Sequence, residues 1–65
     1  MKYVSFHKSP IGFHVFEEGR KHPVGYIKRI EDKYCVIHNR LTREERQDYH
    51  NLTDAKKKIT ELINR

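Results

Sequence analysis

The chain has 65 residues, of which 14 are basic and 9 acidic, and its formal net charge is +5. A chain of this length forms a single domain, 1–65, with a thin core and no deep pocket, because a small domain buries only a modest share of its surface. No apolar run approaches the length of a membrane span. The first ten residues lack the apolar stretch of a secretory signal, so we expect a cytoplasmic protein of a bacterial or phage-infected cell.

The first part of the chain predicts an antiparallel sheet. Four segments rich in β-forming residues are separated by turn residues: 2–7, 11–17, 24–30 and 33–38. The Lys-Ser-Pro sequence at 8–10 is expected to end the first segment. Gly19 permits a positive φ and Pro23 cannot donate a ladder hydrogen bond, so both mark a turn. The pattern predicts a meander of three or four strands within residues 2–38.

Residues 39–51 form a polar segment with only two large apolar side chains, Leu41 and Tyr49. Thr42 followed by Glu45 matches a capping box, which would start a short helix. The same residues also fit a long loop that leads into a brief strand at 48–52. We favour the loop, because a helix without an apolar stripe has little to pack against.

The last segment predicts a helix at 53–64, with Thr53 as its N-cap and Asp54 in its first turn. Its apolar residues fall on one face: Ala55, Ile59, Leu62 and Ile63. A helix this short is marginal alone in water, so it must lie on the sheet. The fold class is therefore α+β, a three- or four-stranded antiparallel sheet packed against one C-terminal helix, with the second sheet face open to solvent.

Positive charge concentrates in the first thirty residues, which hold six basic and two acidic side chains and so carry +4. The other thirty-five hold eight basic and seven acidic residues, or +1. This asymmetry predicts a surface that attracts a polyanion, most plausibly nucleic acid. The competing interpretation is a solvated surface whose cations protect the sheet edges against pairing.

Six cations are the candidate nucleic-acid contacts: Arg20, Lys21, Lys28, Arg29, Lys33 and Arg40. We expect the last four to contact nucleic acid from the sheet, and the first two to grip phosphate. Side chains alternate along a strand, so Lys28 and Arg29 must point to opposite faces. The sequence alone leaves open which of the two points outward. Tyr3, Tyr26, Tyr34 and some of the five histidines compete with these cations for the exposed face, where aromatic rings could instead stack unpaired bases.

The single cysteine excludes an internal disulfide and fits a reducing compartment. Cys35 and His38 have Cys-x-x-His spacing, which is half of a zinc site. On a strand, however, positions three apart point to opposite faces. We therefore expect no metal and no cofactor, with Cys35 as a small core residue. No nucleophile or carboxylate pair stands in a catalytic setting, so we expect no enzyme.

Two stretches, VGYIKRIEDKYCVI and YHNLTDAKKKITELI, carry a resemblance that spans residues 13–63. The layout resembles the arm-binding domain of phage tyrosine-family integrases and small phage-encoded proteins of that shape. The matching positions are Gly25, Tyr26, Tyr34, Tyr49 or Leu52, Thr53 and Ala55. The resemblance implies a sheet-plus-helix fold that inserts its sheet into the DNA major groove.

Three features depart from that pattern: the additional segment 1–10, the long loop 39–51, and the lack of a following recombinase domain. We therefore expect a non-enzymatic nucleic-acid-binding accessory or regulatory protein, with duplex DNA as the favoured partner. The alternative is a small phage-type inhibitor or adaptor. It would contact an acidic host protein through its exposed sheet or the 39–51 loop.

Overall fold

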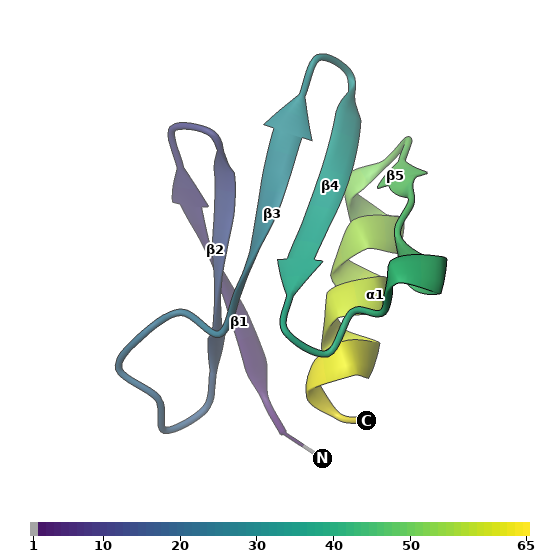
Figure 1. Ribbon diagram of the computed structural model, residues 1–65. Coiled ribbons are helices and arrows are strands. Elements are labelled where there is room, and N and C mark those ends of the chain that lie inside the picture. Colours follow the sequence, from purple (N-terminus) through teal and green to yellow (C-terminus); the bar gives the residue numbers. More distant parts are fainter. Residues whose placement is uncertain (1) are drawn as a thin grey trace.

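Five strands follow one another across a single antiparallel sheet, and one helix crosses one face of that sheet (Figure 1). The computed structural model describes residues 2–65 of the chain. Its elements are β1 Val4–Ser9, β2 Gly12–Glu17, β3 Gly25–Ile30, β4 Lys33–His38, β5 Asp48–Tyr49 and α1 Leu52–Ile63. The predicted α+β class is confirmed, as is the antiparallel sheet with a C-terminal helix.

The sheet has one strand more than predicted, because the two-residue β5 pairs with β4 through Tyr49 opposite Tyr34. β4 has the predicted bounds, whereas β1 runs to Ser9 and does not end before Lys8. Pro10 explains the longer strand. It occupies a two-residue turn closed by the pair Ser9 and Gly12, a place where its fixed φ is favourable.

The segment 39–51 combines both alternatives that the sequence left open. A single 3₁₀ turn, η1, spans Arg43–Glu45, and Thr42 Oγ1 donates to Glu45 Oε1 at 2.9 Å. The Thr42 amide also donates to this carboxylate, at 3.3 Å, which completes the predicted capping box. The turn buries no residue, so it does not grow into a longer helix, and the chain continues into β5.

The helix begins before the predicted cap. Asn51 is the N-cap, and its Oδ1 accepts a hydrogen bond from the Asp54 amide at 2.8 Å. Thr53 therefore lies within the first turn, and the expectation that it caps the helix is wrong. The earlier start brings Leu52 into α1, where it packs against the core. Asn51 and Thr53 are both good capping residues, and the docking of Leu52 favours the first.

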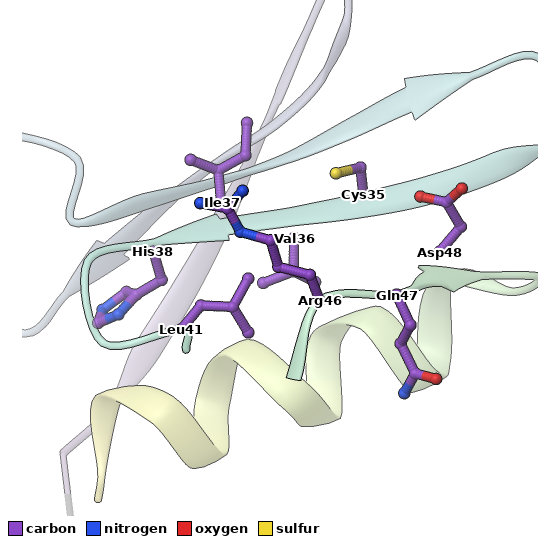
Figure 2. Close-up of a pocket in the computed structure, with 8 residues that line it drawn as sticks. All are labelled: Cys35, Val36, Ile37, His38, Leu41, Arg46, Gln47 and Asp48. Atoms are coloured by element: carbon purple, nitrogen blue, oxygen red, sulfur yellow. The ribbon is translucent and has the colours of Figure 1, made fainter. Parts of the chain in front are cut away.

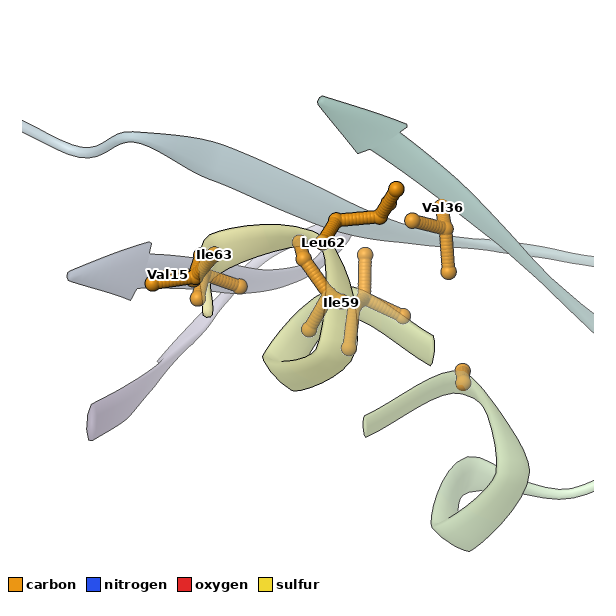
Figure 3. Packing of buried hydrophobic residues seen from close by; sticks show 7 residues of the cluster. Val15, Val36, Ile59, Leu62 and Ile63 are labelled. Carbon is orange, nitrogen blue, oxygen red and sulfur yellow. The ribbon is translucent and has the colours of Figure 1, made fainter. Parts of the chain in front are cut away.

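The core consists of the predicted helix stripe and three strand residues from the middle of the sheet (Figure 3). Its buried members are Val15, Ile27, Val36, Ala55, Ile59, Leu62 and Ile63. Gly25 lets the helix approach closely, because a Cβ at this position would lie 2.9 Å from Ile59 Cδ1 and 2.8 Å from the Ile37 carbonyl oxygen. No helix within residues 2–65 is long and apolar enough to cross a membrane.

Glu45 joins η1 to the end of α1. Its carboxylate accepts from Arg65 Nη2 at 2.7 Å and from Lys58 Nζ, while Arg65 also pairs with Glu61. The hydrogen bonds from Arg65, Lys58 and Thr42 hold the pKa of Glu45 far below its ordinary value of 4.5. The acidic and basic side chains around η1 and the end of α1 thus largely neutralise one another.

Candidate functional site

The sheet register separates two sets of side chains. Val15, Ile27 and Val36 belong to the core, so the alternate residues on their strands lie on the other face. We call that face, which the helix does not cover, the open face. It carries Ser5, His7, Ser9, Gly12, His14, Phe16, Tyr26, Lys28, Ile30, Lys33, Cys35, Ile37 and Asp48.

A row of rings crosses the middle of the open face. His7 lies opposite His14, and His14 lies opposite Tyr26 on the next strand. The rings of His14 and Tyr26 meet edge to face with centroids 5.2 Å apart, and those of His7 and Phe16 do so at 4.9 Å. We call these four residues the ring stripe. Edge-to-face contacts are favourable between aromatic rings, so each ring is held by its neighbour.

Ile37 extends the ring stripe onto β4, where it lies opposite Tyr26. Both side chains are 39% exposed, and Ile30, at the end of β3, is 57% exposed. Tyr26 and Ile37 are neighbours, and Lys28 lies between Tyr26 and Ile30 along β3. Exposed apolar patches on a small protein often mark a binding site. The centre of the open face therefore offers flat, partly apolar rings to solvent.

Two of the predicted cations lie on the open face. Lys28 is opposite Cys35, and Lys33 is opposite Ile30, so both stand near the β3–β4 turn. Both are exposed, and neither forms an ion pair with any residue in 2–65. Their charges are therefore available to an external anion.

Arg29 lies on the helix side of the sheet, opposite Tyr34. It borders a hollow of about 340 Å³ together with Lys8, Phe13 and Leu52. The alternation predicted for Lys28 and Arg29 is confirmed, and the structure resolves its direction. Lys28 points to the open face, and Arg29 points away from it.

Arg40 was expected to contact nucleic acid from the sheet. In the structure it lies away from the open face, at the end of α1. Its Nη1 donates to the carbonyl oxygens of Leu62 at 3.2 Å and Ile63 at 3.1 Å. The last carbonyl groups of a helix lack partners within the helix, and a cation there also opposes the negative end of its dipole. The structure thus gives Arg40 a place as the cap of α1.

The two cations expected to grip phosphate lie in the loop between β2 and β3. Arg20 Nε is 3.5 Å from Glu17 Oε2, and Lys2 Nζ is 2.8 Å from the other carboxylate oxygen. The hydrogen bond from Lys2 is the main cause that lowers the pKa of Glu17. Lys21 is exposed. This loop joins the strand ends farthest from Lys28, so the six candidate cations do not form one cluster.

A hollow of about 520 Å³ runs beside the part of β4 that does not pair with β5. Figure 2 shows the side chain of Arg46 extended toward Ile37, at the margin of the open face. The sequence interpretation missed Arg46 because periodicity does not place a loop residue. It named Tyr26 and histidines as candidates for the exposed sheet face, but it could not place the ring stripe, because that row depends on the register of three strands.

Cys35 and His38 lie on opposite sides of the sheet, as their spacing predicts. Cys35 faces Lys28 on the open face and is half-buried outside the core, so the expectation that it is a core residue is wrong. His38 lies opposite Gly25 on the helix side, where burial and then the charge of Arg40 lower its pKa. Within residues 2–65, no group of three potential metal-ligating side chains is suitably placed.

No protein-family model, curated protein or solved structure matches this chain. The resemblance to the integrase arm-binding domain therefore stays a prediction, and the geometry of the open face has to carry the functional argument.

Proposed function

We propose that the protein is a non-enzymatic nucleic-acid-binding accessory protein, and that its open face holds the nucleic acid. One observation carries this proposal. The open face combines lysines and rings on β1 to β4, and among its described residues a carboxylate occurs only at Asp48, on the β5 edge. Phosphate groups are attracted to such cations, and bases to such rings.

The distribution of ion pairs strengthens the electrostatic part of this proposal. Glu17, Glu45 and Glu61 are all paired with basic residues away from the open face. Lys28 and Lys33 form no ion pair within residues 2–65. Arg46 supplies a further positive charge at the margin of the open face. A polyanion approaching the open face therefore meets cations without having to displace carboxylates from them.

The proposal places the protein in the cytoplasm of a bacterial or phage-infected cell. Nucleic acid is accessible there, and the thiol of Cys35 stays reduced. The accessory role requires no cofactor and no catalytic group. Binding alone, by covering or positioning nucleic acid, is the proposed activity.

The test is binding of labelled oligonucleotides over a range of salt concentrations. The double variant Lys28→Ala, Lys33→Ala should bind more weakly than wild type. Its slope of log K against log salt should be shallower by about 1.4–1.8, because each phosphate contact contributes about 0.7–0.9. A slope unchanged from wild type would show that these lysines do not contact phosphate.

The matched control is Lys57→Glu, which lowers the net charge by the same two units on the outer surface of α1. It should keep most of the affinity of wild type. If it weakened binding as much as the double variant, only net charge would matter and the open face would have no special part. Absence of binding to duplex and single-stranded nucleic acid at low salt would refute the proposal.

The hollow beside β4 favours a second candidate, a protein-binding inhibitor or adaptor. β5 begins at Asp48, opposite Cys35, so the three following residues of β4, Val36–His38, do not pair with β5. A peptide strand from a host protein could continue the sheet there, beside Leu41 and Arg46. A host protein retained from lysate after nuclease treatment, without any oligonucleotide binding, would favour this candidate.

A further inference from the structure

The proposed function leaves the form of the nucleic acid open. Resting on that function, we infer that the open face takes unpaired nucleotides, in single-stranded DNA or RNA, whose bases stack on the ring stripe. Lys28, Lys33 and Arg46 would then follow the phosphates along the strand. Three features of the open face favour unpaired bases over the duplex DNA that the sequence favoured.

The first feature is where the arginines lie. Arginine reads guanine in a duplex through paired hydrogen bonds to the base edge, and its planar fork suits that task. Arg29 points to the helix side, and Arg40 is engaged at the end of α1. The strands of the open face present lysines, which act as point charges. The strands of the open face can therefore bind phosphate groups, but they lack the arginine side chains that read base edges in a duplex.

The second feature is width. The ring stripe and Ile37 extend across four strands, from β1 to β4. With strands about 4.8 Å apart, the axes of the outer two are about 14 Å apart. The major groove of B-DNA is about 12 Å wide and admits a two-stranded ribbon. The whole stripe therefore cannot enter the groove face-on, whereas a flexible single strand can lie across it.

The third feature is the exposed apolar surface. Tyr26, Ile37 and Ile30 are 39%, 39% and 57% exposed and lie beside the two lysines. A duplex presents its phosphates and keeps the faces of its bases stacked inside, so it would leave this surface uncovered. Unpaired bases have free faces that stack on aromatic side chains, with little dependence on sequence.

Tyr26 is the expected centre of stacking. It lies on the middle strand of the sheet, and its edge-to-face contact with His14 holds its ring in place before any ligand arrives. A ring that is already ordered loses little conformational entropy on binding. His7 and Phe16 repeat the arrangement toward β1 and provide a second place for a base.

The first experiment compares one labelled oligonucleotide, alone and annealed to its complement, at the same salt concentration. We expect the single strand to bind at least about tenfold more tightly, as stacking of one base contributes in other proteins. Equal or tighter binding of the duplex would overturn this inference and leave the proposed function standing. Binding of neither form would refute both.

The second experiment tests Tyr26 itself. Tyr26→Ala should lose about tenfold in affinity for the single strand, whereas Tyr26→Phe, which keeps the ring, should stay near wild type. Thermal melts identify any loss that comes from unfolding, and Tyr26→Leu supplies a variant that keeps apolar volume without a ring. Wild-type affinity in the folded Tyr26→Ala or Tyr26→Leu variant would overturn the inference.

Fluorescence can distinguish stacking of a base at position 26 from binding without stacking. The chain contains no tryptophan, so Tyr26→Trp introduces a single fluorescent probe on the ring stripe. Its emission should be quenched when the single-stranded oligonucleotide is added. The same oligonucleotide as a duplex should quench it much less. Undiminished emission at saturating single strand would show that no base stacks there.

Discussion

The two faces of one sheet differ sharply, and β3 shows the difference within a few residues. Ile27, on the helix side, is 1% exposed, whereas Ile30, on the open face of the same strand, is 57% exposed. The helix and the helix side of the sheet supply the whole buried core. A chain of 65 residues can therefore stay folded while half of its sheet surface remains available for binding.

The charges differ between the faces in the same way. On the helix side, Glu45 and Glu61 are neutralised by Lys58 and Arg65, and Arg40 is engaged by carbonyl groups. On the open face, Lys28 and Lys33 have no such partners within the described residues. Similar side chains thus stabilise the fold on one side and are free to bind on the other.

The largest effect expected from this comparison is on stability. Ile27→Ala should lower the free energy of unfolding by about 2–5 kcal/mol, because it removes buried volume that the core cannot refill. Ile30→Ala makes the same chemical change on the open face and should alter stability by less than about 0.5 kcal/mol. Urea unfolding of the two variants measures the difference. Equal losses would mean that the faces are wrongly assigned.

A smaller effect should follow from removing the helix cap. Arg40→Ala should cost about 1 kcal/mol, since it takes away charge-assisted hydrogen bonds to Leu62 and Ile63 at a partly exposed site. Urea unfolding would measure this loss, with Arg29→Ala as the control expected to stay near wild type. The folded Arg40→Ala protein should keep its affinity for nucleic acid. If Arg40→Ala lost affinity for nucleic acid while its free energy of unfolding stayed unchanged, Arg40 would be part of the binding surface.

The Glu45 ion pairs should make a pH-dependent contribution to stability. The pKa of Glu45 is lowered in the folded protein, chiefly by Arg65 and Lys58, so folding favours its ionised form. This contribution is fully present above the ordinary value of 4.5 and is lost as the pH falls toward the folded value. Glu45→Gln removes it.

Unfolding of wild type and Glu45→Gln over a pH series checks this prediction. The difference in stability between them should be present at neutral pH and should shrink below pH 4.5. A difference that stayed constant as the carboxyl group became protonated would show that Glu45 acts through packing and not through its charge.

Periodic patterns made the core side of this molecule predictable. Ala55 and Ile59 follow the helical repeat, the bounds of β4 follow its alternation, and the apolar face of the helix was assigned correctly. The placement of Arg40 was not predictable, because its partners lie more than twenty residues away along the chain. Tertiary contacts, and not local pattern, decide where such a side chain binds.

The open face was predictable only in part. Alternation required Lys28 and Arg29 to separate, yet only the docked helix determines which of them faces solvent. The ring stripe depends on the register of β1, β2 and β3 together, since His7 and Tyr26 meet in one row only through His14. A single strand contains no information about such a row.

The most direct test of the central claim uses the isoleucine methyl groups as reporters of the two faces. NMR spectra of the protein with methyl-labelled isoleucine should be recorded while a single-stranded oligonucleotide is added. The signals of Ile30 and Ile37 on the open face should shift, and those of Ile27 and Ile59 in the core should stay nearly in place. Shifts confined to other residues, or absent at saturating oligonucleotide, would contradict the account.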